Sequence, residues 1–255
     1  MPYVKSKGTD IYYESHGSGP VIIFAHGAGG NAAIWYNQLA HFKETHRCIA
    51  FDHRSFARSP ASDTSITIPS FRDDILAIMD QLEVNQAHLV GQSMGGYSVL
   101  RCALDAPERV NTLTLSCTPA GIPIPNPTEA IQSLGSRGAE GIQATMSKKT
   151  FENPALVQLY AAIQSFNTEF SFDRLSALRH EEDQVKPEAL RSLHVPTLFI
   201  SGTEDPLFLP EQLSELVPLF QEARIEIVAD AGHSPYFEQP SIFNRLLADH
   251  INRHS

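Results

Sequence analysis

Six short apolar runs, separated by longer segments, constrain the fold of this chain most strongly. Each run is rich in Val, Ile, Leu or Phe, which suits a strand that is buried on both faces of a sheet. The runs are VIIFAH (21–26), HRCIAFD (46–52), AHLVG (87–91), VNTLTLSC (110–117), PTLFISG (196–202) and RIEIVAD (224–230). Between most of them, apolar residues recur at helical spacing. This alternation predicts an α/β fold with a doubly wound, mostly parallel sheet covered by helices on both faces.

The sequence also predicts two amphipathic helices and an N-terminal hairpin. One helix is marked by apolar residues every three or four positions: Phe71, Ile75, Ile78 and Leu82. We expect this helix to begin at Ser70, with Asp73 completing a capping box. A second stripe predicts a closing helix: Ile242, Phe243, Leu246, Leu247 and Ile251. Residues 3–20 alternate around Gly8, which predicts an antiparallel hairpin and hence a mixed sheet.

The alternation breaks between residues 118 and 193. The segment TPAGIPIPNP (118–127) is too proline-rich for a strand, and apparent helices follow it. One of them begins at Asn153-Pro154 and carries a regular apolar stripe: Leu156, Leu159, Ile163, Phe166 and Phe170. The apolar face of such a helix can pack against the rest of the protein and also cover a cavity. We expect residues 118–193 to be a helical lid inserted into an α/β core formed by residues 1–117 and 194–255.

The composition argues against several classes of partner. Asp and Glu total 29 against 19 for Lys and Arg, and the resulting net charge of -10 disfavours nucleic acid or an anionic membrane as the main partner. No apolar stretch approaches the roughly 18 residues of a membrane span, and the N-terminus has no apolar signal core. We therefore expect a cytoplasmic protein with one large core, and a small molecule as its partner.

The cysteines do not indicate a disulfide or a metal site. Cys48, Cys102 and Cys117 are far apart, odd in number and without a C-x-x-C spacing. We expect three buried thiols.

The motif GQSMG at residues 91–95 matches G-x-S-x-G and places Ser93 in a tight turn from a strand to a helix. In such a turn the serine takes a strained conformation that lifts its hydroxyl above the sheet, and the two glycines leave room for the crossing chain. A phosphate-binding loop is disfavoured, because neither G-x-x-x-x-G-K-[ST] nor G-x-G-x-x-G is present here or after the first parallel strand. A chance match in a structural turn is excluded only if a base and an acid accompany the serine.

A base and an acid do occur in the expected order. A serine hydroxyl becomes nucleophilic when an imidazole takes its proton and a carboxylate orients that imidazole. Asp205 follows the fifth apolar run and His233 follows the sixth, so both lie with Ser93 at the carboxyl edge of the sheet. The order Ser93, Asp205, His233 predicts a catalytic triad. Glu204 and Asp52 are rival acids, and Asp205 is preferred because it begins the Asp-Pro turn after its strand.

Two backbone N–H groups should stabilise the oxyanion. Met94, which follows the nucleophile, supplies one, and Ala28 in the loop HGAGG supplies the other. His26 is interpreted as a brace for that loop. The candidate pocket residues are Gly27, Phe56 and Phe166, and further apolar side chains of the lid are Phe151, Tyr160 and Phe170.

These motifs resemble those of the α/β-hydrolase fold superfamily, in particular the single-domain bacterial type with a helical cap that includes carboxylesterases, enol-lactonases and perhydrolases. The resemblance covers essentially the whole chain and rests on HGAGG, FDHRSFARS, GQSMGG, VPTLFISGTEDP and AGHSPYFEQP, in this order. One loop departs from the family pattern D-x-R-G-x-G-x-S, because Ser55 and Ala57 replace the two glycines. Non-glycine residues disfavour positive φ, so this loop could follow another path and Phe56 could point into the pocket.

The resemblance implies three candidate functions. The first is hydrolysis of a small, mostly apolar ester or lactone through an acyl-enzyme on Ser93, with no cofactor or metal and with perhydrolysis as a side activity. A serine at this turn argues against the alkyl-enzyme chemistry of dehalogenases and epoxide hydrolases.

The second candidate function is carbon-carbon bond hydrolysis of ring-cleavage products. Relatives with that activity usually carry an arginine before the acid and a tryptophan near the histidine, whereas here Thr203 and Glu204 precede the acid and the single tryptophan is Trp35. The third is a non-catalytic member that binds a small ligand.

Overall fold

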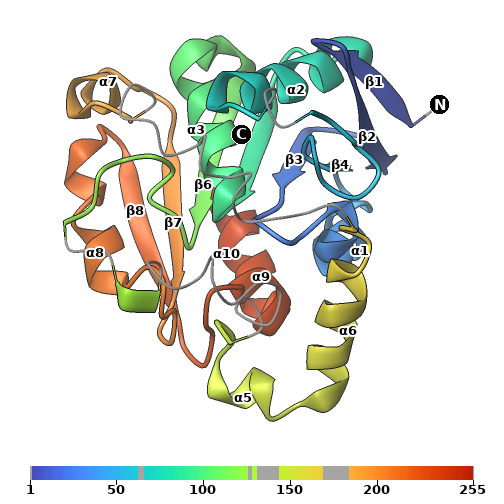
Figure 1. The fold of residues 1–255 in the computed structure, drawn as a ribbon. Helices are drawn as coiled ribbons and strands as arrows, with labels where there is room; N and C mark the ends of the chain where they lie inside the picture. The colour runs from blue at the N-terminus through green and yellow to red at the C-terminus, as the bar shows by residue number, and fades with distance from the viewer. Residues whose placement is uncertain (1, 63–65, 126–127, 131–143, 169–183, 255) are drawn as a thin grey trace.

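One sheet of eight strands forms the centre of the molecule. The computed structural model describes residues 2–62, 66–125, 128–130, 144–168 and 184–254. The strands lie in the order β1-β2-β4-β3-β5-β6-β7-β8 (Figure 1). Their bounds are β1 Tyr3–Ser6, β2 Thr9–His16, β3 Val21–Ala25, β4 Arg47–Phe51, β5 Ala87–Gln92, β6 Val110–Ser116, β7 Thr197–Gly202 and β8 Ala223–Val228. The six predicted runs are the strands β3 to β8, each within two residues of its expected bounds.

The sheet is mixed, as predicted. Strands β1 and β2 form an antiparallel hairpin whose two-residue turn consists of Lys7 and Gly8, both with positive φ (46° and 84°). This combination is typical of a type I′ turn, which matches the twist of the flanking strands. Strand β2 then pairs antiparallel with β4, and the remaining neighbours pair in parallel. The parallel part brings the carboxyl ends of β3 to β8 to one edge.

The helices confirm the overall pattern and correct one boundary. Their bounds are α1 Tyr36–Phe42, α2 Ile68–Gln81, α3 Met94–Asp105, α5 Lys148–Phe151, α6 Pro154–Gln164, α7 Pro187–Arg191, α8 Pro210–Ser214, α9 Pro235–Glu238 and α10 Pro240–Arg253. The predicted Ser70 and Asp73 capping box is wrong. Thr67 caps α2, with its hydroxyl accepting the Ser70 N–H at 3.2 Å and the Ser70 hydroxyl accepting the Thr67 N–H at 3.0 Å. Helix α2 starts earlier because Pro69, which lacks an N–H, fits its first turn.

The segment between β6 and β7 contains α5, α6 and α7, and Figure 1 shows α5 and α6 away from the sheet, next to α9 and α1. Asn153 caps α6 as predicted. The predicted apolar stripe is only partly buried: Ile163 is 6% exposed, but Leu159 is 36% and Phe166 63% exposed. The buried face of α6 also includes Tyr160, whose ring packs 5.0 Å from that of Phe237 on α9. Phe170 lies outside the described residues.

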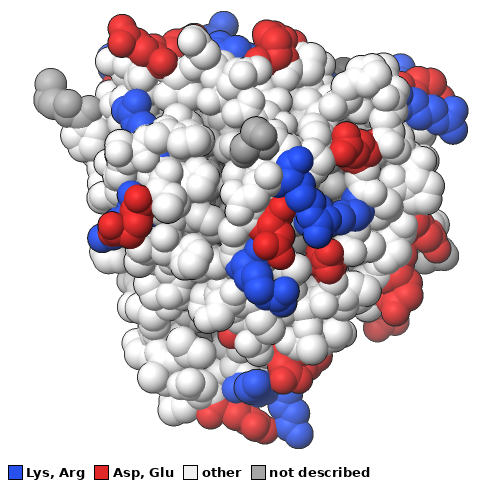
Figure 2. Space-filling model, turned by 180° about the vertical axis from the view of Figure 1, so that it is seen from behind, with Lys and Arg blue, Asp and Glu red and all other residues white. Residues whose placement is uncertain are grey.

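Charged side chains of both signs are interspersed on the face seen in Figure 2, and neither sign forms a large patch there. Several are paired, for example Lys5 with Asp10 at 2.7 Å and Arg109 with Asp80 at 2.8 Å. Exposed pairs of this kind contribute little to stability. Among the described residues, no helix is both long and apolar enough to cross a membrane.

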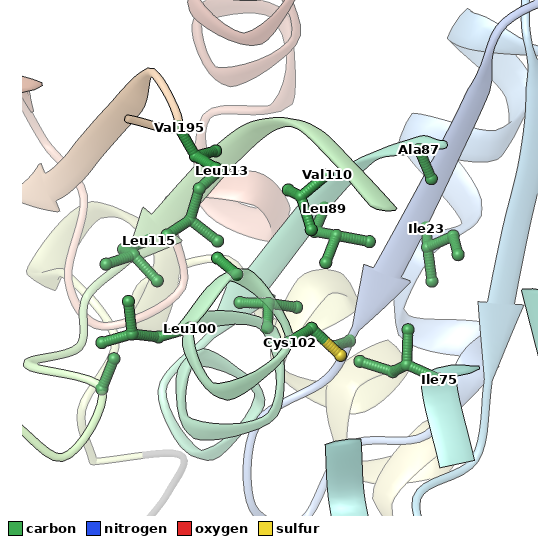
Figure 3. Packing of buried hydrophobic residues seen from close by; sticks show 14 of the residues in the cluster. Ile23, Ile75, Ala87, Leu89, Leu100, Cys102, Val110, Leu113, Leu115 and Val195 are labelled. Carbon is green, nitrogen blue, oxygen red and sulfur yellow. The ribbon is translucent and has the colours of Figure 1, made fainter. Parts of the chain in front are cut away.

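Two large apolar clusters of the described residues lie on opposite faces of the sheet, because successive strand residues point to opposite faces. On one face Ile23 and Leu89 pack with residues of α2 and α3, as Figure 3 shows. On the other face Ile22 and Val90 pack with residues of α1 and α10. The three cysteines are free thiols buried in the protein, as predicted. Helices on both faces and a mostly parallel sheet confirm the doubly wound fold.

Candidate active site

Ser93 occupies a strained turn between β5 and α3. Its φ of 48° and ψ of -115° are unfavourable for a side chain with a Cβ. Hydrogen bonds hold this conformation: the Ser93 N–H donates to the Ser116 carbonyl at 3.0 Å, and the Ser93 carbonyl accepts from the Gly96 N–H at 2.9 Å and the Thr118 hydroxyl at 2.7 Å. The serine therefore has the backbone conformation that the motif predicts.

The glycines of the motif are required by close packing. A Cβ on Gly95 would lie 2.2 Å from the Ala25 carbonyl oxygen, and one on Gly91 would lie 2.5 Å from the Gly95 carbonyl oxygen. Both distances are far below van der Waals contact, so the crossing of β3 and α3 beneath Ser93 depends on residues without a side chain.

Asp205 and His233 form a buried hydrogen-bonded pair after β7 and β8. His233 Nδ1 lies 2.9 Å from Asp205 Oδ2, and the two residues are 4% and 2% exposed. The second oxygen, Asp205 Oδ1, accepts the N–H groups of Leu207 at 2.9 Å and Phe208 at 3.3 Å. Because both carboxylate oxygens have partners, the carboxylate is fixed in the orientation that holds the imidazole.

The loops that carry these residues meet at the carboxyl edge of the sheet. Gln92, directly before Ser93, donates its side-chain N–H to the His233 carbonyl at 2.9 Å. A Cβ on Gly27 would lie 3.1 Å from the Ser93 Cβ and 2.0 Å from Gln92 Oε1. The loop after β3 therefore lies directly against Ser93. The His233 loop is bonded to Gln92, the residue before Ser93.

The two predicted oxyanion donors lie in this region. Met94 is the first residue of α3, so its N–H has no acceptor within the helix. The side chains of Met94 and Phe56 belong to one small apolar cluster, against which Ala28 also packs. Phe166, the third candidate pocket residue, follows α6 and is mostly exposed.

The rival acids have other partners. Glu204 is exposed, and its Oε2 accepts the Lys148 N–H at the start of α5 (2.8 Å). Asp52 is fully buried, and its carboxylate accepts the Ala32 N–H at 2.7 Å and the Arg58 guanidinium at 2.7 Å. Asp205 is therefore the only one of the three acids that contacts His233 in the described residues.

His26 braces the loop after β3, in agreement with its interpretation from the sequence. Its Nδ1 bonds to the Gly27 carbonyl at 2.8 Å, and its Nε2 accepts the His53 N–H at 3.0 Å. Burial lowers the pKa of His26 to about 4, so the ring is neutral near pH 7 and can accept this bond.

The loop with two replaced glycines keeps positive φ, at 69° for Ser55 and 38° for Ala57. Hydrogen bonds offset the strain: the Ser55 N–H donates to the Ser59 carbonyl at 2.7 Å, and the Ala57 N–H donates to Asn167 Oδ1 at 3.1 Å. Phe56 between them points inward and is 1% exposed, with its ring 5.0 Å from that of His26.

Cys117 is a neighbour of the pair that sequence reasoning missed. Its Sγ, the Asp205 carboxylate and a His233 ring nitrogen lie within 4.8 Å of one another. Burial raises the pKa of Cys117 well above its usual value, and the Asp205 carboxylate raises it further, so the group is a neutral thiol. These donor types suit zinc, but the 2.9 Å contact between His233 and Asp205 is a hydrogen bond that a metal would have to separate. The signal was present in the sequence, since Cys117 ends a predicted strand at this same edge.

Comparison with known proteins identifies the class. The family model for the alpha/beta hydrolase fold matches residues 20–148, and this chain belongs to that family. The protein is a hydrolase.

Several relatives span nearly the whole chain. RutD of Azorhizobium caulinodans, which is named as a carbamate hydrolase, is 27% identical over 267 residues, covering 97% of each chain. The 3-oxoadipate enol-lactonase 2 of Acinetobacter baylyi is 26% identical, covering 89% of this chain and 87% of its own length. Among solved structures, Est816, described as an N-acyl homoserine lactone degrading enzyme, is 28% identical with a TM-score of 0.83, covering 97% of this chain and 99% of its own.

Proposed function

We propose that this hydrolase cleaves small, mostly apolar carboxylic esters or lactones through an acyl-enzyme on Ser93. The observation that carries the proposal is the fixed pair of His233 and Asp205 at the sheet edge where Ser93 occupies its strained turn. In this arrangement Ser93 is the nucleophile, His233 the general base and Asp205 the group that orients His233.

The proposed reaction has two halves. The Ser93 hydroxyl attacks the substrate carbonyl while His233 Nε2 takes its proton, and the N–H groups of Ala28 and Met94 stabilise the oxyanion. The intermediate then expels the alkoxide, which receives the proton from His233. Water attacks the acyl-enzyme by the same route, with His233 again as base, and releases the acid. For a lactone, the acid and the alcohol leave as one molecule.

The substrate class is inferred from the surroundings of the proposed oxyanion donors and from the relatives. Apolar side chains of Phe56 and Met94 lie beside those donors, which favours an apolar acyl group over a charged one. The named activities of Est816 and the enol-lactonase support a lactone or ester carbonyl as the reacting group. We propose that the inserted residues 118–193 act as the lid over this small-molecule site.

A substrate panel tests this function. Wild-type protein is assayed with p-nitrophenyl esters of short and medium chain length, N-acyl homoserine lactones, an aryl carbamate and a ring-cleavage product. We expect the highest kcat/KM for an ester or a lactone. Turnover of the ring-cleavage product alone would instead support carbon-carbon hydrolysis, and ligand binding without any turnover would support a non-catalytic member.

The rate should depend on pH because the proposed base acts only as neutral imidazole. Over an assay range of about pH 5 to 8, we expect kcat/KM to fall toward the acid end, approaching about tenfold for each pH unit as the base becomes protonated. The rate falls toward low pH because protonation removes the lone pair that accepts the serine proton. Initial rates with the best ester of the panel measure this profile, and a rate that stays constant over the whole range would argue against a histidine base.

A further inference from the structure

One backbone contact joins the His233 loop to Thr145 of the inserted segment, shortly before α5. The His233 N–H donates to the Thr145 carbonyl at 2.9 Å. A Cβ on Gly232 would lie 2.3 Å from that same carbonyl oxygen and 2.7 Å from the Ser147 nitrogen. The two backbones are thus in direct contact beside His233.

One buried carboxylate links the same two segments. Glu238, on α9, is 7% exposed. Its Oε1 accepts the N–H groups of Gly232 and Ser234, both at 3.0 Å, and these residues flank His233. Its Oε2 accepts the Ser147 N–H at 2.7 Å. Hydrogen bonds from N–H groups to a carboxylate are among the stronger ones, so Glu238 fixes the loop on both sides of His233 and ties it to Ser147.

After α6, the inserted segment is bonded to the loop that carries the proposed oxyanion donor. The Asn167 side-chain N–H donates to the carbonyls of Gly29 at 2.7 Å and Gly30 at 3.1 Å, next to Ala28. Its Oδ1 accepts the Ala57 N–H. Asn31, 1% exposed, donates to the Ile163 carbonyl near the end of α6 at 2.8 Å. The end of α6 is therefore fixed to residues 29–31 from two directions.

We propose that residues 145–167, called the strap below, set the relative position of the base and the oxyanion donors, with Glu238 and Asn167 as positioning residues. The inference rests on the proposed function, because it assigns His233 and Ala28 their roles. The strap spans from the His233 loop to the Ala28 loop through α5 and α6, so it holds the two halves of the site at a fixed separation. A displacement of either loop by a fraction of an ångström changes the reacting geometry without closing the substrate pocket.

Two isosteric substitutions release the strap at one end each. In Asn167→Asp, one oxygen still accepts the Ala57 N–H, but the other faces the carbonyls of Gly29 and Gly30 and repels them. In Glu238→Gln, the amide NH₂ must face either Ser147 or the two N–H groups beside His233, so one side of the link is lost. Neither residue is placed in contact with substrate.

Each variant is expected to lower kcat on the best ester by about 10- to 100-fold, because small misplacements of reacting groups have effects of this size. KM should stay within about threefold of the wild-type value, because the substitutions remove no contact that binds the substrate equally in the ground state and the transition state. Matched controls are Ser165→Ala, which removes a hydroxyl that donates to the Ala162 carbonyl within α6, and Glu215→Gln, an exposed carboxylate directly after α8. Both controls should keep wild-type kcat, and thermal unfolding of every variant checks that the loss of rate is not a loss of folded protein.

The outcomes separate the strap from the proposed function. If Ser93→Ala is inactive while Asn167→Asp and Glu238→Gln keep wild-type kcat, the strap proposal fails alone. If Ser93→Ala keeps wild-type activity, the proposed function fails. If Glu238→Gln does not fold, Glu238→Asp replaces it: this variant keeps the charge but is too short for all three N–H groups, and a wild-type kcat for it would count against the strap.

Discussion

Replacing Asp205 with asparagine is expected to lower kcat by about 10⁴-fold. Asp205 Oδ1 accepts two backbone N–H groups, so the amide oxygen of asparagine takes that place and its NH₂ group faces His233 Nδ1. Nδ1 must then be the acceptor, and the proton moves to Nε2. An imidazole with its proton on Nε2 cannot accept the proton of Ser93, while the size and shape of the site are unchanged.

This result is measured as kcat on the best ester, with Asp249→Asn as the matched control. Asp249 is exposed on α10, so the same chemical change there should leave kcat within about threefold of the wild type. A loss of less than tenfold in Asp205→Asn would show that another group orients the base.

Replacing Ser93 with alanine is expected to lower kcat by about 10³-fold or more, with the fold intact. The substitution removes only the hydroxyl, because alanine can retain the same backbone hydrogen bonds to Ser116, Gly96 and Thr118. The residual rate then comes from water attacking a carbonyl that the oxyanion donors still polarise.

Ser192→Ala is the control for this substitution, since Ser192 is an exposed serine that caps the end of α7. It should have wild-type kinetics. Retention of most activity in Ser93→Ala would contradict the assignment of the nucleophile, and unfolding curves of the two variants would show whether a low rate has a structural cause.

The strands and the local geometry of Ser93 could be predicted because both depend on short stretches of sequence. An apolar run bounded by polar segments predicts a buried strand wherever it occurs, and the β3 to β8 strands follow this rule. The strained turn at Ser93 is imposed by its own neighbours, Gly91 and Gly95. The pairing of Asp205 with His233 follows from one further step, since the ends of parallel strands share one edge.

The positioning contacts could not be predicted because they join distant segments. Asn167 bonds to Gly29, 138 positions away, and Ser147 bonds to Glu238, 91 positions away. Sequence periodicity carries no information on such pairs. It also misjudged the stripe of α6, because the buried face is decided by Tyr160 packing on Phe237 and leaves Leu159 partly exposed.

The loop with Ser55 and Ala57 shows how tertiary contacts offset an unfavourable local sequence. Both residues keep positive φ, which costs free energy for a side chain with a Cβ. The Asn167 side chain accepts the Ala57 N–H, and Phe56 is buried among apolar and aromatic side chains. A rule based on glycine alone left the path of this loop open, because the stabilising partners come from elsewhere in the chain.

The most direct test of the central claim is to locate the residue modified by a fluorophosphonate probe. Wild-type protein is labelled at neutral pH, digested and analysed by peptide mass spectrometry. We predict one adduct, on Ser93, that is absent from Ser93→Ala and forms much more slowly in Asp205→Asn. Labelling of another residue, or no labelling by a preparation that hydrolyses the ester, would contradict Ser93 as the nucleophile.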